Sequence, residues 1–303
     1  MSANNKHMDH LGSMRLFVRV VDRRSFTMAA SDLGIPRSTA TVVIRELERH
    51  LNCRLLNRTT RVVSPTVDGQ IYYGHCVAVL ASIDEAEASF RNPQPSGLLR
   101  IDAHGMLSRT FLLPKLPEFL ARYPQIDLHI GQGDRLVDLV REGIDCAIRV
   151  GELTDSTLIK RTLASIPEIT CASPAYLAHH GTPQTPDDLA AHQMIGFVSS
   201  RTGSVIPLEF RVGDKTVKTT LASRVTVNDS DTSADLARLG FGLVQAPLYR
   251  FSKDLASGTL VEVLRPYRPA ETTVSAIYPQ ARQTSPRLRA FLDWTSKVFS
   301  KIG

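Results

Sequence analysis

Hydrogen-bond donors and positive charges are concentrated between residues 37 and 61. The side chains concerned are Arg37, Ser38, Thr39, Thr41, Arg45, Arg58, Thr59, Thr60 and Arg61. Guanidinium and hydroxyl groups are the donors that bind phosphate oxygens and the edges of base pairs. Up to Thr66 the chain holds eleven of its 36 basic and five of its 30 acidic residues, so the remainder is neutral and the net charge of +6 lies in this part. This concentration of charge predicts double-stranded DNA as a partner.

Small and turn-forming residues around this set predict a helix-turn-helix that positions it. Ala29 and Ala30 let two helices approach closely, and Gly34 permits the tight turn between them. Pro36 suits the start of the next helix. In that helix we expect four apolar side chains to point inward, namely Val42, Val43, Leu47 and Leu51. The outer face then consists of Arg37, Ser38, Thr41, Arg45 and Arg49 and would enter the major groove.

The basic segment after this helix is typical of a β-wing bounded by Pro65 and Gly69. Its sequence at 55–61, Leu-Leu-Asn-Arg-Thr-Thr-Arg, resembles the winged helix-turn-helix of LysR-type transcriptional regulators, and the similarity continues through the whole chain. Family members commonly have a polar residue in place of Pro36 and a basic one in place of Val42. The resemblance implies a regulator that binds an operator with dyad symmetry and responds to a small-molecule effector. It also implies a homodimer or a homotetramer, and RNA polymerase as a further candidate partner.

A heptad pattern follows the wing and predicts a long helix. Apolar residues recur at spacings of four and three, at Tyr72, Cys76, Val79, Ile83, Ala86 and Phe90. Such a seam either packs on its own domain or pairs with a second helix, and the family resemblance implies that it dimerises two chains. The segment Asn-Pro-Gln-Pro-Ser-Gly at 92–97 then ends the helix and marks a hinge linker.

Beyond the linker, alternating strands and helices predict an α/β fold with a parallel, helix-covered sheet. We expect helices at 111–123, 135–142, 187–191, 232–239 and 286–299, and strands at 98–103, 126–130, 146–150, 169–172, 242–245, 260–264 and 273–278, with a β-rich stretch at 208–227. The pattern resembles the two-lobed, periplasmic-binding-protein-like effector domain of the family. The expected boundaries are 1–66 for the DNA-binding domain, 67–92 for the linker helix and 97–303 for the effector-binding domain. Lobe I takes 98–167 and 269–303, and lobe II takes 168–268.

Ligands of two-lobed α/β domains bind beyond the carboxyl ends of the strands. The residues expected there are His104, Met106, Ser108, Arg149, Gly151, Phe197, Asn228 and Asp229. Ser108 is either a helix cap or a carboxylate-binding hydroxyl, and Arg149 is either a structural ion-pair former or the charge that binds an anionic ligand. An anionic organic effector, such as an aromatic or short-chain carboxylate, is the expectation that follows from these residues and the resemblance.

Other classes of function find little support in the sequence. Nucleophile-elbow, P-loop and complete dinucleotide-binding motifs are missing, so we expect no enzyme and no cofactor. His104, His179, His180 and His192 lack partners at metal-ligand spacing, so we expect no metal. The four cysteines are widely spaced and are expected to be reduced, mostly buried thiols, with Cys146 and Cys171 as minor candidates for oxidant sensing.

No apolar run reaches the roughly 20 residues of a membrane span, and we expect a cytoplasmic protein without a membrane partner. One alternative is an architectural DNA-binding protein whose C-terminal domain has lost its ligand. Another is a solute-binding or enzymatic two-lobed protein fused to a helix-turn-helix. The effector, the operator, the sign of regulation and the oligomer size stay open at this stage.

Overall fold

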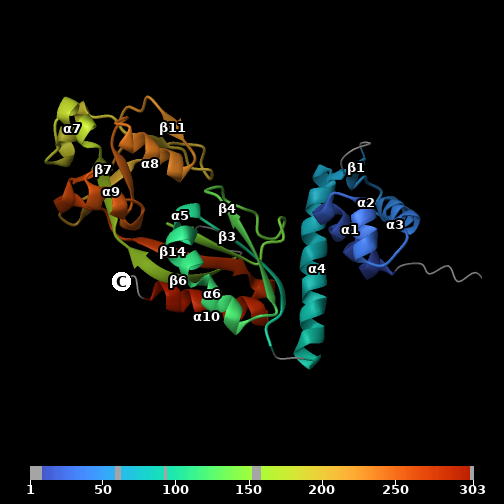
Figure 1. The fold of residues 1–303 in the computed structure, drawn as a ribbon. Helices are drawn as coiled ribbons and strands as arrows, with labels where there is room; N and C mark the ends of the chain where they lie inside the picture. Colours follow the sequence, from blue (N-terminus) through green and yellow to red (C-terminus); the bar gives the residue numbers. More distant parts are fainter. Residues whose placement is uncertain (1–8, 59–62, 92–93, 152–157, 301–303) are drawn as a thin grey trace, which may run out of the picture. The chain divides into compact units, whose positions relative to one another are not determined.

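The computed structural model describes residues 9–58, 63–91, 94–151 and 158–300 (Figure 1). The chain divides into two units, the first comprising Met1–Gln94 with Asp138–Asp145 and the second comprising Pro95–Val137 with Cys146–Gly303. Among the described residues, no helix is both long and apolar enough to cross a membrane.

Three helices form the core of the N-terminal unit: α1 (His10–Arg23), α2 (Phe26–Asp32) and α3 (Arg37–His50). The carboxylate of Asp9 and the hydroxyl of Ser25 cap the first two by accepting the backbone N–H groups of Gly12 and Met28. Gly34 has a φ of +64°, the left-handed conformation that the turn between α2 and α3 requires. Buried side chains from all three helices form one core, including Leu16, Phe17, Val20, Ala29, Ala30, Ala40, Ile44 and Leu47.

One prediction for α3 was wrong. Val43 and Leu47 are buried and Leu51 packs against the core, but the side chain of Val42 is 50% exposed. The inward stripe runs instead through Ala40, Val43, Ile44 and Leu47, which follow the three-and-four spacing of one helix face. Val42 lies outside that stripe, and it was predicted to point inward only because it is apolar.

The wing is an antiparallel hairpin of β1 (Leu56–Arg58) and β2 (Val63–Pro65). The Glu48 carboxylate accepts the N–H groups of Leu55 at 3.0 Å and Leu56 at 3.2 Å, so α3 holds the start of β1 directly. The Thr66 hydroxyl donates to the Arg54 carbonyl at 2.7 Å and accepts the N–H of Gly69 at 2.9 Å. These bonds fix the end of the wing to the first turn of the next helix.

The long helix α4 spans Val67–Arg91. In its first half, Cys76 is buried in the core of the N-terminal unit and Tyr72 packs against that core. This part of the predicted heptad seam therefore packs on its own domain. Val79 is 41% exposed and Ile83 is half-buried. The side chains of Ala86 and Phe90 lie outside the described residues.

A five-stranded sheet in the order β4-β3-β5-β14-β6 organises the second unit. Its strands are β3 (Gly97–Ala103), β4 (Ile126–Gln132), β5 (Cys146–Val150), β6 (Leu158–Ile166) and β14 (Thr272–Pro279). The prediction of a parallel sheet holds for β3, β4 and β5, but β14 runs antiparallel to both β5 and β6. The exceptions are the strands on which the chain leaves for the second lobe and returns from it.

Helices on one face of this sheet bury its apolar side chains. They are α5 (Gly105–Leu107), a π-helical turn η1 (Ser108–Leu112), η2 (Leu113–Lys115), α6 (Leu116–Arg122) and α10 (Pro286–Phe299). Leu288, Phe291, Leu292, Thr295 and Phe299 of α10 are buried, as predicted.

Two segments between residues 98 and 167 differ from the prediction. The strand β6, an edge strand in which polar and charged residues are mixed, was not predicted. The helix predicted at 135–142 is absent, and 139–143 forms a turn. There the Asp138 carboxylate accepts the N–H of Arg141, and the Glu142 carboxylate accepts the N–H of Asp138. The N–H of Glu142 donates to the Asp138 carbonyl at 2.9 Å, so the segment closes a single turn.

The second lobe is built on an antiparallel sheet in the order β12-β7-β13. Its strands are β7 (Glu168–Ala172), β8 (Gly196–Phe197), β9 (Leu208–Val212), β10 (Lys215–Thr219), β11 (Thr226–Val227), β12 (Val244–Pro247) and β13 (Val261–Val263). Its helices are α7 (Pro174–His180), η3 (Pro186–Ala191), α8 (Ser230–Arg238), η4 (Leu248–Arg250), α9 (Ser252–Ser257) and η5 (Arg265–Tyr267), and a last turn, η6 (Gln280–Arg282), precedes α10.

Candidate DNA-binding surface and effector cleft

The outer face of α3 carries the predicted DNA-binding residues. Arg37, Ser38 and Arg45 are exposed, and Thr39 and Thr41 are half-buried. The Thr41 hydroxyl donates to the Arg37 carbonyl at 3.1 Å. Its oxygen can still accept a hydrogen bond, whereas the arginines present several donors outward. The helix therefore exposes a short, basic face rich in donors.

The wing residues can be placed only in part. Arg58 ends β1, so its backbone belongs to the hairpin. Its side chain, and Thr59, Thr60 and Arg61, lie outside the described residues. Asn57, next to Arg58, is exposed.

In the effector unit, the carboxyl ends of β3, β4 and β5 meet at one edge of the sheet because these strands are parallel. His104 follows β3, and its Nδ1 atom lies 2.5 Å from Oδ1 of Asp134, which follows β4. The residues predicted from the sequence follow the first and third strands but not the second, so Asp134 was not among them. The signal was available in the Gly-Gln-Gly-Asp run at 131–134.

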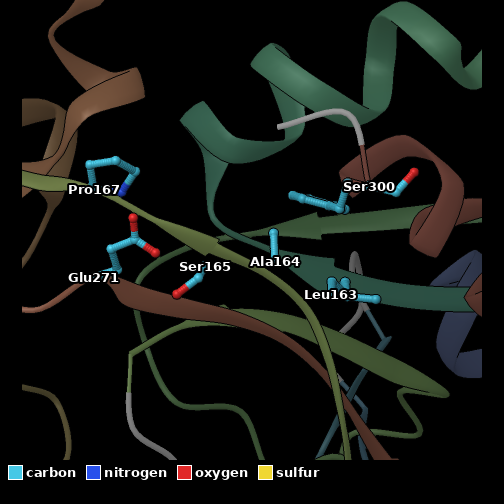
Figure 2. Close-up of a pocket in the computed structure, with 7 residues that line it drawn as sticks. Leu163, Ala164, Ser165, Pro167, Glu271 and Ser300 are labelled. Atoms are coloured by element: carbon cyan, nitrogen blue, oxygen red, sulfur yellow. The ribbon is translucent and has the colours of Figure 1, made fainter. Parts of the chain in front are cut away.

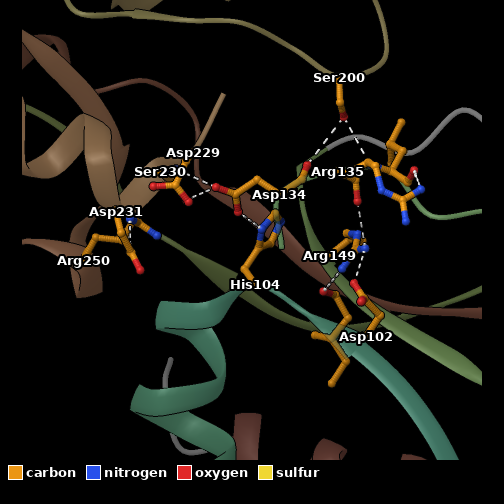
Figure 3. A network of polar contacts seen from close by, with 12 residues as sticks. Asp102, His104, Asp134, Arg135, Arg149, Ser200, Asp229, Ser230, Asp231 and Arg250 are labelled. Carbon is orange, nitrogen blue, oxygen red and sulfur yellow. Dashed lines mark hydrogen bonds and ion pairs between the residues drawn. The ribbon is translucent and has the colours of Figure 1, made fainter. Parts of the chain in front are cut away.

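Asp134 connects the two lobes (Figure 3). Its Oδ2 accepts the N–H and the hydroxyl of Ser230, each at 2.5 Å, at the first residue of α8. Burial alone would raise the pKa of Asp134, but hydrogen bonds from His104 and Ser230 outweigh burial and hold the pKa well below its usual range. The carboxylate is thus a stable anion at the positive end of a helix.

Further contacts join the lobes around α8. Arg109 of the π-helical turn pairs with Asp231, and Arg250 donates to the same carboxylate at 2.9 Å. The Ser200 hydroxyl accepts the N–H of Leu136 at 3.1 Å. The ring of Phe111 meets that of Tyr249 at 5.1 Å between centroids. The π-helical turn, a rare form often found at functional sites, places Arg109 and Phe111 against the other lobe.

Ser108 is fully buried, inside the helical segment rather than at its start. Its N–H donates to the His104 carbonyl at 2.9 Å, so the predicted helix-start position was wrong: the segment begins at Gly105. Within the described part of the chain, the Ser108 hydroxyl has no hydrogen-bond partner. A buried hydroxyl without a partner is costly, and a bound polar group would satisfy it.

Arg149 occupies a buried ion pair. Its side chain is 3% exposed, and its Nη2 donates to Asp102 at 2.5 Å and to the Arg135 carbonyl at 3.2 Å (Figure 3). Gly131 lies beside Asp102 in the sheet, where a Cβ atom would come within 2.6 Å of the carboxylate. This arrangement favours the structural role for Arg149 over the ligand-binding one.

The other predicted effector residues have differing environments. Met106 and Phe197 are half-buried, Asn228 is exposed, and the N–H of Gly151 donates to the Thr273 carbonyl. Asp229 caps α8 by accepting the N–H of Thr232 at 2.7 Å. The structure therefore brings together His104 and the start of α8, and the residues that sequence reasoning missed as members of the cluster are Arg109, Asp134, Ser230, Asp231 and Arg250.

A hollow of about 360 Å³ lies elsewhere in this unit, beside the two crossings between the lobes (Figure 2). Its lining comprises Leu163, Ala164, Ser165, Pro167, Glu271, Phe299 and Ser300. None of the predicted effector residues lines it.

The cysteines and potential metal ligands give no further site. Cys76, Cys146 and Cys171 are buried thiols, and Cys53 is half-buried. Burial raises the pKa of Cys171 to about 12, which suppresses the reactive thiolate. In the part of the chain that the structure describes, no three His, Cys, Asp or Glu side chains are grouped to hold a metal ion.

Known proteins resemble the chain in both of its parts. Residues 11–70 match the model of the bacterial regulatory helix-turn-helix protein, lysR family, and residues 92–300 match that of the LysR substrate binding domain. An HTH-type transcriptional repressor of Pseudomonas aeruginosa is 36% identical over 296 residues, covering 97% of this chain and 93% of that protein. The uncharacterized HTH-type transcriptional regulator YhjC of Escherichia coli is 36% identical over 298 residues, covering 97% of this chain and 99% of that one.

The same order of parts occurs in solved structures. CrgA, a LysR-type transcriptional regulator from Neisseria meningitidis, matches with a TM-score of 0.59 and 30% identity, over 96% of this chain and 98% of that chain. The predicted succession of a helix-turn-helix and a LysR effector-binding domain is thereby confirmed, as is the prediction of a regulator rather than an enzyme. The chain belongs to the LysR family of transcriptional regulators and is a DNA-binding regulator with an effector-binding domain.

Proposed function

We propose that the protein binds an operator of dyad symmetry by placing α3 in the major groove and the wing along the phosphates. The exposed, basic face of Arg37, Ser38 and Arg45 carries this proposal, because such side chains read base edges and bind phosphate. A cytoplasmic location follows from a chromosomal target, and RNA polymerase is the proposed neighbour at a promoter.

Two substitutions test this docking. Arg58→Ala removes a phosphate contact, so it should weaken binding to all duplexes and lower the slope of log affinity against log salt by about 1. Arg37→Ala should instead relax sequence preference, lowering the difference in binding free energy between cognate and scrambled duplexes by about 1–3 kcal/mol. Fluorescence anisotropy over a salt series, with cognate and scrambled duplexes, separates the two. Unchanged affinity in both variants would contradict this placement of α3 and the wing.

We propose that α4 pairs with the α4 of a second chain through the later part of its heptad seam. The exposed fraction of 41% at Val79 supports this, since the earlier seam residues Tyr72 and Cys76 are occupied by the helix's own domain. Changing Val79 and Ile83 together to Asp should place unpaired charges in the seam and give monomers. Sedimentation velocity measures this directly, and dimers that persist would place the interface elsewhere. Whether dimers join into tetramers is read from the same experiment with the native chain.

We propose that the effector is a small organic anion that enters between the lobes. The position of the Asp134 carboxylate supports this proposal: it lies between His104 and the N-terminus of α8, whose N–H donors and positive end favour an anion. The fully buried Ser108 hydroxyl, which lacks a partner among the described residues, offers a further polar contact. A ligand that touched both lobes could shift the balance between open and closed forms in proportion to its differential affinity.

The test begins with a thermal-shift screen of aromatic and short-chain carboxylic acids against the full-length protein. For a carboxylate that stabilises the native chain, Ser108→Ala should leave operator binding unchanged and abolish or weaken the ligand's effect on the DNA footprint. An undiminished response in Ser108→Ala would move the site away from this cleft. If no carboxylate binds, the alternative of a ligand-free C-terminal domain gains support.

A further inference from the structure

The outer face of α3 contains one apolar residue among its charged and polar ones. Val42 is 50% exposed, which places it among the large hydrophobic side chains left open to solvent. It lies four residues after Ser38, three before Arg45 and seven before Arg49, so helical spacing places these residues along one stripe. The stripe is therefore basic at its C-terminal end and apolar at its middle.

Single exposed apolar residues are common and need no explanation by themselves. The position of Val42 is more specific, because its neighbours on the stripe include Arg45 and Arg49, and charges of this sign favour a polyanion as the partner of the whole face. Within the major groove of DNA, the apolar group that projects from a base edge is the C5 methyl of thymine. A β-branched valine presents its own methyl groups in few rotamers, so the contact would be rigid.

We infer that Val42 contacts the 5-methyl group of a thymine in each half of the operator and makes the regulator select that base. The inference rests on the proposed placement of α3 in the major groove. It adds a specificity-determining residue whose contact is apolar, beside the hydrogen-bonding and charged residues of the same face. The methyl group can be removed from the DNA by itself, because replacing thymine by uracil keeps every hydrogen-bonding group of the base.

The experiment uses the full-length protein and a duplex that it selects from a random pool. Each thymine is replaced in turn by deoxyuridine, and affinity is measured by anisotropy at fixed salt. At one position in each half-site, uracil should weaken binding of the native protein about fourfold, the value of one buried methyl group. In Val42→Ala, uracil at this position should leave the affinity unchanged, while substitutions at other positions should have the same effects as in the native protein.

Two controls protect the result. Val67→Ala removes the side chain of another exposed valine, 74% exposed at the start of α4, and should retain the full uracil effect. The same thymine–adenine pair is also replaced by a cytosine–guanine pair, with and without a 5-methyl group on cytosine. The methyl group should raise the affinity of the native protein and leave that of Val42→Ala unchanged. Thermal midpoints of the variants check that the fold is unchanged.

The outcomes separate two kinds of failure. If no thymine shows a uracil effect in the native protein, or if the effect survives in Val42→Ala, the assignment of Val42 is overturned. If Ser38→Ala and Arg45→Ala also bind the selected duplex with native affinity, the placement of α3 itself is wrong.

Discussion

Arginine is used in opposite ways by α3 and by the effector domain. Arg37 and Arg45 of α3 are exposed to solvent, whereas Arg149 and Arg250 are buried beside the carboxylates of Asp102 and Asp231. A guanidinium in solvent retains its hydration and can exchange water for phosphate or base. A buried guanidinium requires an opposite charge beside it, and its role is then to maintain the fold. The sequence presents the same residue type in both regions, and only the partner distinguishes them.

The sharpest contrast between the regions should appear on breaking the buried pair. Asp102→Ala leaves the Arg149 charge buried without its carboxylate, which should lower the free energy of unfolding by about 3–5 kcal/mol. Arg45→Ala removes an exposed charge and should change the free energy of unfolding by less than about 0.5 kcal/mol. Chemical denaturation followed by circular dichroism measures both changes in the full-length protein.

DNA affinity should show the reverse order. Arg45→Ala should lose affinity, while Asp102→Ala, under conditions where it remains folded, should bind DNA normally. Equal destabilisation by the two substitutions would remove the distinction between an outward-facing and a structural arginine.

The same comparison explains which features could be predicted from the sequence. The helix-turn-helix depends on local signals, such as the cap at Ser25, the left-handed turn at Gly34 and the spacing of Ala40, Val43 and Leu47. Hydrophobic spacing also located α10 correctly at 286–299. Val42 was misplaced because residue type was given more weight than its angle around the helix.

The cleft depends on contacts that no local pattern encodes. Asp102 and Arg149 are 47 positions apart, and Asp134 and Ser230 are 96 apart. Their partnership follows from the order of strands in the sheet and from the packing of one lobe against the other. The turn at 139–143, predicted as a helix, shows the same limitation on a smaller scale, since the side chains of Asp138 and Glu142 close it with bonds to backbone N–H groups.

A smaller effect should follow from removing the carboxylate between the lobes. Asp134→Ala deletes the acceptor of the N–H and hydroxyl of Ser230, so the first turn of α8 should exchange its amide hydrogens about tenfold faster, as expected for the loss of a charged hydrogen bond. Hydrogen exchange read by mass spectrometry measures it. Asp127→Ala, on the exposed side of the same strand region, is the control and should leave α8 unchanged. Native exchange in Asp134→Ala would mean that other contacts hold the lobes together.

Glu168 provides a third kind of charge, half-buried near one of like sign. Burial, together with the charge of Glu209, raises the pKa of Glu168 to about 7. Because the pKa of the folded state lies above the ordinary value of 4.5, folding favours the protonated acid. This contribution is complete below about pH 4.5 and is lost as the pH rises through about 7.

Glu168→Gln removes this titration, so the variant should gain stability relative to the native protein between pH 5 and pH 8. We expect a relative gain of at least about 1 kcal/mol, or a rise of about 2–4 °C in the thermal midpoint for a domain of this size. Glu271→Gln, an exposed carboxylate at the other crossing between the lobes, should show the native pH dependence. Scanning calorimetry at the two pH values measures both variants. If Glu168→Gln and the native protein lose stability equally on going to pH 8, the carboxylate has found a partner or water, and it belongs with the compensated charges of Arg149 and Arg250.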